Sequence, residues 1–135
     1  MQTEHERKEA GTINVPITVS NYDLDCILCT CFEGGSNYWI EKVRALYNDY
    51  KGAKYVSEVI SHGGKLRVSV DGEEHLLTKR MLLKGCELYI AGRRRWRPDD
   101  FDAEDTDIIL QYALFGDVVY GKSIIGGWVK LPPIT

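Results

Sequence analysis

A β-hairpin is the feature that most constrains the fold of this chain. Apolar and polar residues alternate over positions 65–70 (KLRVSV), a period of two that is typical of a strand with one buried face. Asp71 and Gly72 follow, and both tolerate the positive φ that a tight two-residue turn requires. The returning strand is expected at about residues 74–77. The hairpin therefore predicts an antiparallel sheet as one layer of the fold.

Three helices are expected where capping side chains precede apolar residues at helical spacing. Ser20, Thr78 and Asp102 can each accept a hydrogen bond from the first turn, and Asp23 completes a capping box with Ser20. Glycines end the first and last helices, whereas Gly85 interrupts the second and weakens its prediction. The expected buried faces hold Leu24, Ile27, Leu28 and Cys31; Met81, Leu82, Cys86 and Tyr89; and Ile108, Ile109, Tyr112 and Phe115.

Four further segments have weaker patterns. Residues 13–19 (INVPITV) alternate with period two and predict a strand, at a sheet edge because Pro16 lacks a backbone donor. Residues 38–50 fit a helix or a strand equally well, and residues 54–62 predict a short helix. A fourth strand is expected at 117–120.

These elements predict an α+β fold: a single small domain with a short, mainly antiparallel sheet packed with three or four helices. The chain has 135 residues, 44% of them hydrophobic, which is enough for one core. We expect a flexible polar tail at 1–12, the domain at 13–121 and an extended tail at 122–135.

Charge and hydropathy limit the class of protein and its expected location in the cell. Seventeen basic and twenty acidic residues give a net charge of −3, which argues against a general nucleic-acid binder. No apolar run is long enough to cross a membrane, and residues 1–10 do not resemble a signal peptide. We therefore expect a cytoplasmic protein with reduced cysteines.

Four arginines and a tryptophan follow one another at Arg93, Arg94, Arg95, Trp96 and Arg97. Guanidinium groups pair with phosphate or carboxylate, and an indole ring can stack on a base or a cation. An anionic ligand, a nucleotide or a partner is expected to bind here if one binds at all. The alternative is that the six acidic residues that follow by position 107 neutralise the arginines in a solvated loop.

The cysteines suggest a metal site only weakly. Cys26, Cys29 and Cys31 lie within one expected helix, and the chain has no second CxxC motif to complete four zinc ligands. We interpret them, with Cys86, as ordinary buried or surface thiols. The acidic run lacks the glycine and the spacing of a calcium loop. We expect no metal, no cofactor and no catalytic residues.

Two segments carry a resemblance. Residues 32–39 (FEGGSNYW) close the first helix, and residues 111–121 (QYALFGDVVYG) close the last. Together with Gly63-Gly64, the hairpin and the Lys84-Gly85 helix, they resemble a family of small proteins encoded by bacteriophages, prophages and mobile elements, mainly of Gram-positive bacteria. The similarity covers roughly residues 15–121. The resemblance implies a biological context, the cytoplasm of a bacterial host, and offers no catalytic residues to carry over to this chain.

The turn at residues 33–39 has two interpretations. It can pin the first helix against the sheet, with Trp39 in the core. Alternatively Glu33, Ser36, Asn37 and Tyr38 line a polar pocket, which makes Asn37 and Tyr38 candidate binding residues. Gln111 is a candidate for facing a partner.

The leading hypothesis for function is a non-enzymatic accessory protein of a phage or mobile element. It would bind a host protein, including a component of antiviral defence, or a small nucleotide. One alternative is a nucleic-acid-binding protein that uses residues 93–97. Another is a small metal- or thiol-dependent enzyme. Self-association into a homo-oligomer is a further expectation.

Overall fold

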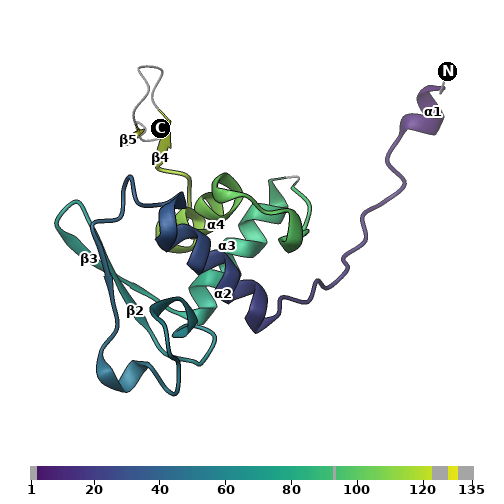
Figure 1. Ribbon diagram of the computed structural model, residues 1–135. Helices are drawn as coiled ribbons and strands as arrows, with labels where there is room; N and C mark the ends of the chain where they lie inside the picture. The colour runs from purple at the N-terminus through teal and green to yellow at the C-terminus, as the bar shows by residue number, and fades with distance from the viewer. Residues whose placement is uncertain (1–2, 93, 123–127, 131–135) are drawn as a thin grey trace.

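A computed structural model describes residues 3–92, 94–122 and 128–130. In this part of the chain, three helices pack on one side of a three-stranded antiparallel sheet of order β1-β2-β3, so the predicted α+β fold is confirmed (Figure 1). The helices are α2 (Asn21–Thr30), α3 (Lys79–Ala91) and α4 (Ala103–Phe115), and the strands are β1 (Lys42–Arg44), β2 (Leu66–Val70) and β3 (Glu73–Leu77).

The predicted hairpin forms with its turn at the expected residues. Asp71 and Gly72 have φ values of 50° and 77°, and β2 pairs with β3 so that Leu66 lies opposite Leu77. The alternating apolar residues of β2 are buried against the helices, as the period of two requires.

All three predicted N-caps are present. The Ser20 side chain accepts from Asp23 N at 3.0 Å, and the Thr78 side chain accepts from Met81 N. Asp102 and Asp105 form a reciprocal capping box at the start of α4. At the other end of α4, Gly116 has φ 74°, the left-handed conformation that favours glycine at this position.

Helix α2 ends differently from the prediction. The chain continues into one π-helical turn, η1 (Cys31–Gly35), before it leaves the helix. This wider turn keeps Cys31 fully buried, where its Sγ donates to Thr106 O of α4 at 3.2 Å. The turn therefore brings the start of the 36–40 segment against α4.

Gly85 allows α3 and α4 to approach closely. A Cβ at this position would lie 2.5 Å from Ile109 O and 2.9 Å from the Ala113 Cβ. The glycine that weakens the prediction of α3 is thus the contact point between two helices. The expected face of α4 was partly wrong: Leu110 and Ala113 are buried, whereas Tyr112 and Phe115 are half-buried, because α4 is surrounded by several elements.

The predicted strand at 13–19 does not form. This stretch is extended and unpaired within the described residues, because no sheet edge of the domain lies beside it. It belongs to a longer segment, residues 8–19, which we call the arm. The arm leads from the short exposed helix α1 (Glu4–Arg7) to α2 and projects from the domain (Figure 1).

The other weak patterns resolve into shorter elements. Residues 38–50 contain β1 and the 3₁₀ turn η2 (Tyr47–Asp49), and the helix expected at 54–62 is only the 3₁₀ turn η3 (Val56–Glu58). The fourth strand, β4 (Tyr120–Lys122), is shifted from 117–120 and pairs with β5 (Trp128–Lys130). A short 3₁₀ turn, η4 (Pro98–Asp100), precedes α4. The rest of the tail expected at 122–135 lies outside the described residues.

No helix among the described residues combines the length and the hydropathy needed to span a bilayer.

Candidate functional site

A buried carboxylate joins α4 to the segment that follows η1. Asp107 is 5% exposed, and each of its oxygens accepts two hydrogen bonds. Ser36 Oγ and Trp39 Nε1 donate to Oδ1, both at 2.7 Å. The Tyr38 hydroxyl and Gln111 Nε2 donate to Oδ2. We call these five residues the Asp107 network. Its acceptors are fully used, as burial of a carboxylate requires.

Gln111 extends the Asp107 network to the segment before β4. Its Oε1 accepts from the backbone of Val119 and Tyr120, both at 2.8 Å, and its Nε2 also donates to Tyr120 O at 3.2 Å. The Gln111 amide thus hydrogen-bonds this backbone through both its donor and its acceptor, as the backbone of a neighbouring strand would. Gln111 is fully buried, so the expectation that it faces a partner is wrong.

Aromatic rings close the apolar side of the same junction. Trp39 stacks on Tyr120 with ring centroids 5.4 Å apart and lies 5.5 Å from Phe115. Trp39 is 5% exposed, which confirms its predicted place in the core. The segments at 32–39 and 111–121 therefore meet through both the hydrogen bonds and the rings.

Tyr38 is turned into the Asp107 network. Its hydroxyl donates to Asp107 and accepts from Gln111 Nε2 at 3.2 Å. Burial, together with the Asp107 carboxylate, raises the pKa of Tyr38 well above its usual value. The hydroxyl is therefore a permanently protonated donor at physiological pH, and its observed role is to hold the 36–40 segment.

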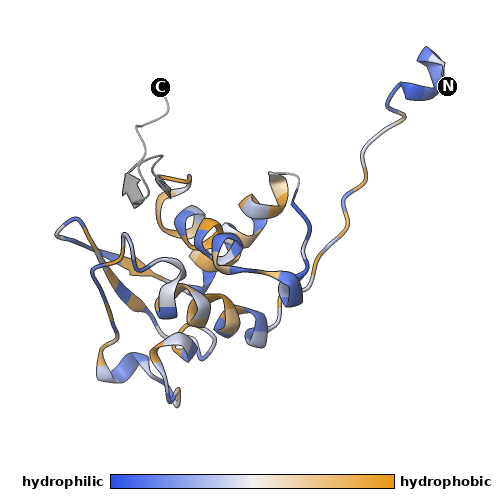
Figure 2. Ribbon diagram, turned by 45° about the horizontal axis from the view of Figure 1, so that its top comes forward, coloured by the Kyte–Doolittle hydropathy of each residue, from blue (hydrophilic) through white to orange (hydrophobic). Residues whose placement is uncertain are grey.

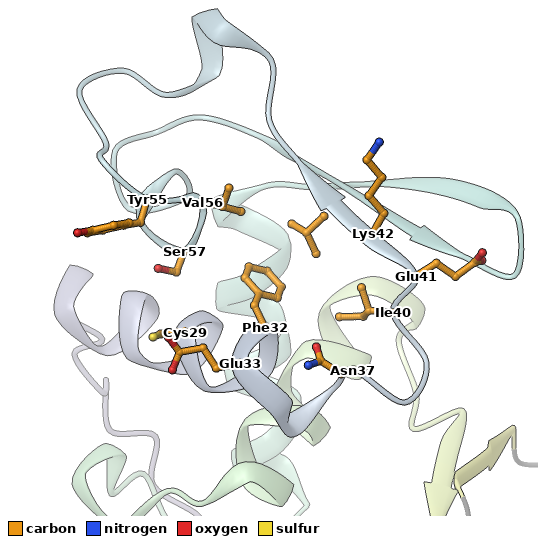
Figure 3. Close-up of a pocket in the computed structure, with 11 residues that line it drawn as sticks. Cys29, Phe32, Glu33, Asn37, Ile40, Glu41, Lys42, Tyr55, Val56 and Ser57 are labelled. Atoms are coloured by element: carbon orange, nitrogen blue, oxygen red, sulfur yellow. The ribbon is translucent and has the colours of Figure 1, made fainter.

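Beside this junction lies a surface pocket of about 370 Å³ (Figure 3). Helix α2 with η1 forms one wall, and the 37–43 segment and the 55–57 loop form the others. The lining is apolar at Phe32, Ile40, Val43 and Val56, and polar at Cys29, Glu33, Asn37, Glu41, Lys42, Tyr55 and Ser57. Of the candidate binding residues, Asn37 lies in this pocket, whereas Tyr38 contributes by anchoring its neighbour.

The rim of the pocket is net acidic. Glu33 and Glu41 contribute two carboxylates and Lys42 contributes one ammonium group, and the side chains of Glu41 and Lys42 both extend away from the α2 wall (Figure 3). Glu41 Oε1 accepts from Gly72 N of the hairpin turn at 2.6 Å. Glu33 is exposed and makes no ion pair with a described residue. The carboxylate of Glu33 lies beside the Cys29 thiol and is exposed at the pocket.

The basic segment at 93–97 lies on another part of the surface, after α3. The Arg94 guanidinium lies over the Tyr89 ring at 5.3 Å. Trp96 is half-buried and packs edge-on against Phe101, with centroids 5.3 Å apart. Arg95 and Arg97 are exposed and form no ion pair with a described carboxylate. Arg93 lies outside the described residues.

The sequence did not indicate Asp107 as a site residue, because Asp107 belongs to the acidic run at 99–107, in which a helix cap at Asp102 and solvated side chains explain the charges. That interpretation holds for Asp102 and is wrong for Asp107. One available signal was the spacing of Asp107 and Gln111, two polar residues four apart that flank the apolar residues 108–110 of the helix.

The four thiols differ in burial. Cys26 is exposed, Cys29 is half-buried, and Cys31 and Cys86 are buried. Burial raises the pKa of Cys31 and of Cys86 to about 12, and burial beside Glu33 raises the pKa of Cys29. The reactive thiolate is therefore scarce at Cys31 and Cys86 at pH 8.

We expect iodoacetamide at pH 8 to alkylate Cys26 first and Cys29 more slowly. Cys31 and Cys86 should react only after the protein is unfolded in urea, because the folded core excludes the reagent and holds both thiols protonated. Peptide mass mapping at successive times measures the order. Alkylation of Cys31 or Cys86 in the folded protein at the rate of Cys26 would contradict the burial described here.

Among the described residues, no three His, Cys, Asp or Glu side chains gather closely enough to hold a metal ion. Comparison with protein-family models finds no match to this chain. Neither the curated proteins nor the solved structures give a match. The fold therefore defines the chain as a small α+β domain. Its surface pocket has an apolar floor and acidic residues at the rim.

Proposed function

We propose that this protein acts by binding a partner protein, and that the pocket beside η1 receives a lysine or arginine side chain of that partner. The pocket supports this proposal because an apolar floor and an acidic rim suit a side chain with an aliphatic stem and a cationic head. Glu33 would pair with the charge, while Phe32 and Val56 would contact the stem. The amide of Asn37 and the hydroxyl of Ser57 add hydrogen-bonding groups at the rim.

The charge of the rim favours a protein partner over a small nucleotide at this pocket. The Glu33 carboxylate on the α2 wall repels a phosphate, whereas the Lys42 ammonium group, which would attract one, extends away from that wall. The exposed guanidinium groups among the described residues lie outside the lining of the pocket, and Arg95 and Arg97 are two of them. Trp96, which would have to stack on a base, instead packs against Phe101. Binding at residues 93–97 stays a prediction.

The accessory role that the sequence resemblance implies belongs to the same proposal. The partner would be a protein of the bacterial host, and a component of antiviral defence is included among the candidates. Recognition of one basic side chain in a pocket would serve as the anchor of a larger contact, since a few buried anchors carry most of the binding energy in protein interfaces.

Selection from a random peptide library displayed on phage tests the proposal with the full chain as bait. We expect enrichment of peptides that carry Lys or Arg next to apolar residues, because these match the acidic rim and the apolar floor. Glu33→Lys should abolish the enrichment by placing a like charge in the pocket, and Glu33→Gln should weaken it.

A matched control is Glu104→Lys, which makes the same charge change on an exposed residue of α4 outside the pocket. This variant should select the same peptides as the wild type. Enrichment of acidic peptides, or equal enrichment with Glu33→Lys, would show that the pocket does not bind as proposed.

A further inference from the structure

The arm presents three apolar side chains that the rest of the described chain leaves largely exposed. Ile13 is 85% exposed, Val15 is 69% exposed and Ile17 is 48% exposed, and Figure 2 shows orange stretches along the arm. The backbone of residues 9–19 makes no hydrogen bond to the backbone of any described residue. An extended segment with free donors, free acceptors and alternating apolar side chains is suited to pairing with another strand.

The sequence of the arm reads nearly the same in both directions. Residues 12–18 are Thr-Ile-Asn-Val-Pro-Ile-Thr, with Val15 at the centre. If two copies pair antiparallel about Val15, Ile13 of one copy lies opposite Ile17 of the other, and Thr12 lies opposite Thr18. Such like-with-like pairs stabilise neighbouring strands. No charged residue occurs between Glu9 and Asp23, so this pairing brings no like charges together.

Asn14 opposite Pro16 is the one pair of unlike residues in this arrangement, and it fits the hydrogen-bond pattern of two antiparallel strands. If Val15 and Val15 form a hydrogen-bonded pair, the residues at odd positions direct their N–H and C=O groups to the other strand, and those at even positions direct them away. Pro16 then sits opposite Asn14, at a position where no donor to the partner is needed. Because Pro16 lacks a backbone donor, the outer edge of each arm pairs poorly with a third strand. The assembly therefore stops at two copies.

We propose that two copies of this chain form a symmetric dimer through antiparallel pairing of their arms about Val15. A groove of about 660 Å³ between the arm and α3 is lined by Ile13, Val15, Ile17, Leu83, Cys86 and Ile90, among others. The second arm fills this groove, and its apolar face packs on α3. Such packing is needed, because a two-stranded pair is not stable alone in water.

Paired proline variants test the dimer in the full-length chain. Val15→Pro removes the central donor of the pairing edge, so light scattering should give the monomer mass of 15.3 kDa. Asn14→Pro makes the same substitution on the outward edge and should keep the dimer mass of the wild type. Both sites are exposed and outside the core, so folding should be unchanged by circular dichroism. A wild-type monomer at about 0.1 mM, a concentration far above the dissociation constants of about 10⁻⁷–10⁻¹⁰ M of antibody–antigen interfaces of standard size, would overturn the proposal, as would a dimer in Val15→Pro.

The register is tested by disulfide formation in a Cys26→Ser background, which removes the exposed thiol. Directly opposed residues in such a pair have Cα atoms about 5.5 Å apart, within reach of a disulfide. Val15→Cys should therefore form a covalent dimer under mild oxidation, whereas Thr18→Cys, which lies opposite Thr12, should not. Equal cross-linking of both variants, or of neither, would overturn the proposed register.

Discussion

Replacing Asp107 with asparagine is expected to lower the free energy of unfolding by about 2–6 kcal/mol. The amide nitrogen of Asn would face two of the four donors that now meet a carboxylate oxygen, and each buried donor left without an acceptor costs about 1–3 kcal/mol. Ser36 and Gln111 have no solvent exposure, so water does not replace the lost acceptor without rearrangement.

Urea unfolding, followed by the fluorescence of Trp39 and the other tryptophans, measures this loss. Asp99→Asn is the control, because Asp99 is an exposed residue of η4 and the same change there should shift stability by less than about 0.5 kcal/mol. Equal stabilities of the two variants would contradict the role given to the Asp107 network.

Gly85→Ala is the second substitution with a large expected effect, a loss of about 1–3 kcal/mol. On an exposed helix the same change stabilises by about 1 kcal/mol, because alanine is the better helix former. Here the new Cβ would lie 2.5 Å from the backbone oxygen of Ile109, and backbone atoms cannot yield as a flexible side chain can. Separating α3 from α4 to relieve this overlap costs packing energy.

Thermal and urea unfolding of Gly85→Ala decide the sign of the effect. Lys84→Ala, on the exposed side of the same helical turn, is the matched control and should leave stability nearly unchanged. A gain in stability on Gly85→Ala would mean that the two helices are farther apart than described.

The elements that could be predicted from the sequence are those whose determinants are local. The turn at Asp71 and Gly72 and the caps at Ser20, Thr78 and Asp102 depend on residues within a few positions. Each of them forms as expected.

What could not be predicted depends on contacts between distant parts of the chain. Asp107 is buried only because Ser36, Tyr38 and Trp39 reach it from about 70 residues away. The arm has the pattern of a strand, yet a strand requires a partner, and the described domain offers none beside it. The strand predicted at residues 13–19 is therefore wrong for the described chain, and only its extended conformation agrees with the prediction.

The candidate site, too, was predictable only where its residues lie close together in the sequence. Asn37 was proposed from its turn and lies in the pocket, but the opposite wall at Val56 and Ser57 has no motif that indicates a site. Tyr38, proposed beside it, points instead into the Asp107 network. The two neighbouring side chains point to opposite sides of the turn, so Asn37 lies at the surface and Tyr38 lies inside.

The most direct test of the central claim is an NMR titration of the isotope-labelled full chain with n-pentylammonium, the side chain of lysine with one added carbon. Binding with a dissociation constant on the order of 1 mM corresponds to about −4 kcal/mol, which is reasonable for six heavy atoms. We predict that the amide signals of Asn37, Val56 and Ser57 shift with pentylammonium and not with pentanoate, and that Glu33→Lys abolishes the shifts. Equal shifts with pentanoate, or shifts confined to residues outside the pocket, would contradict the account.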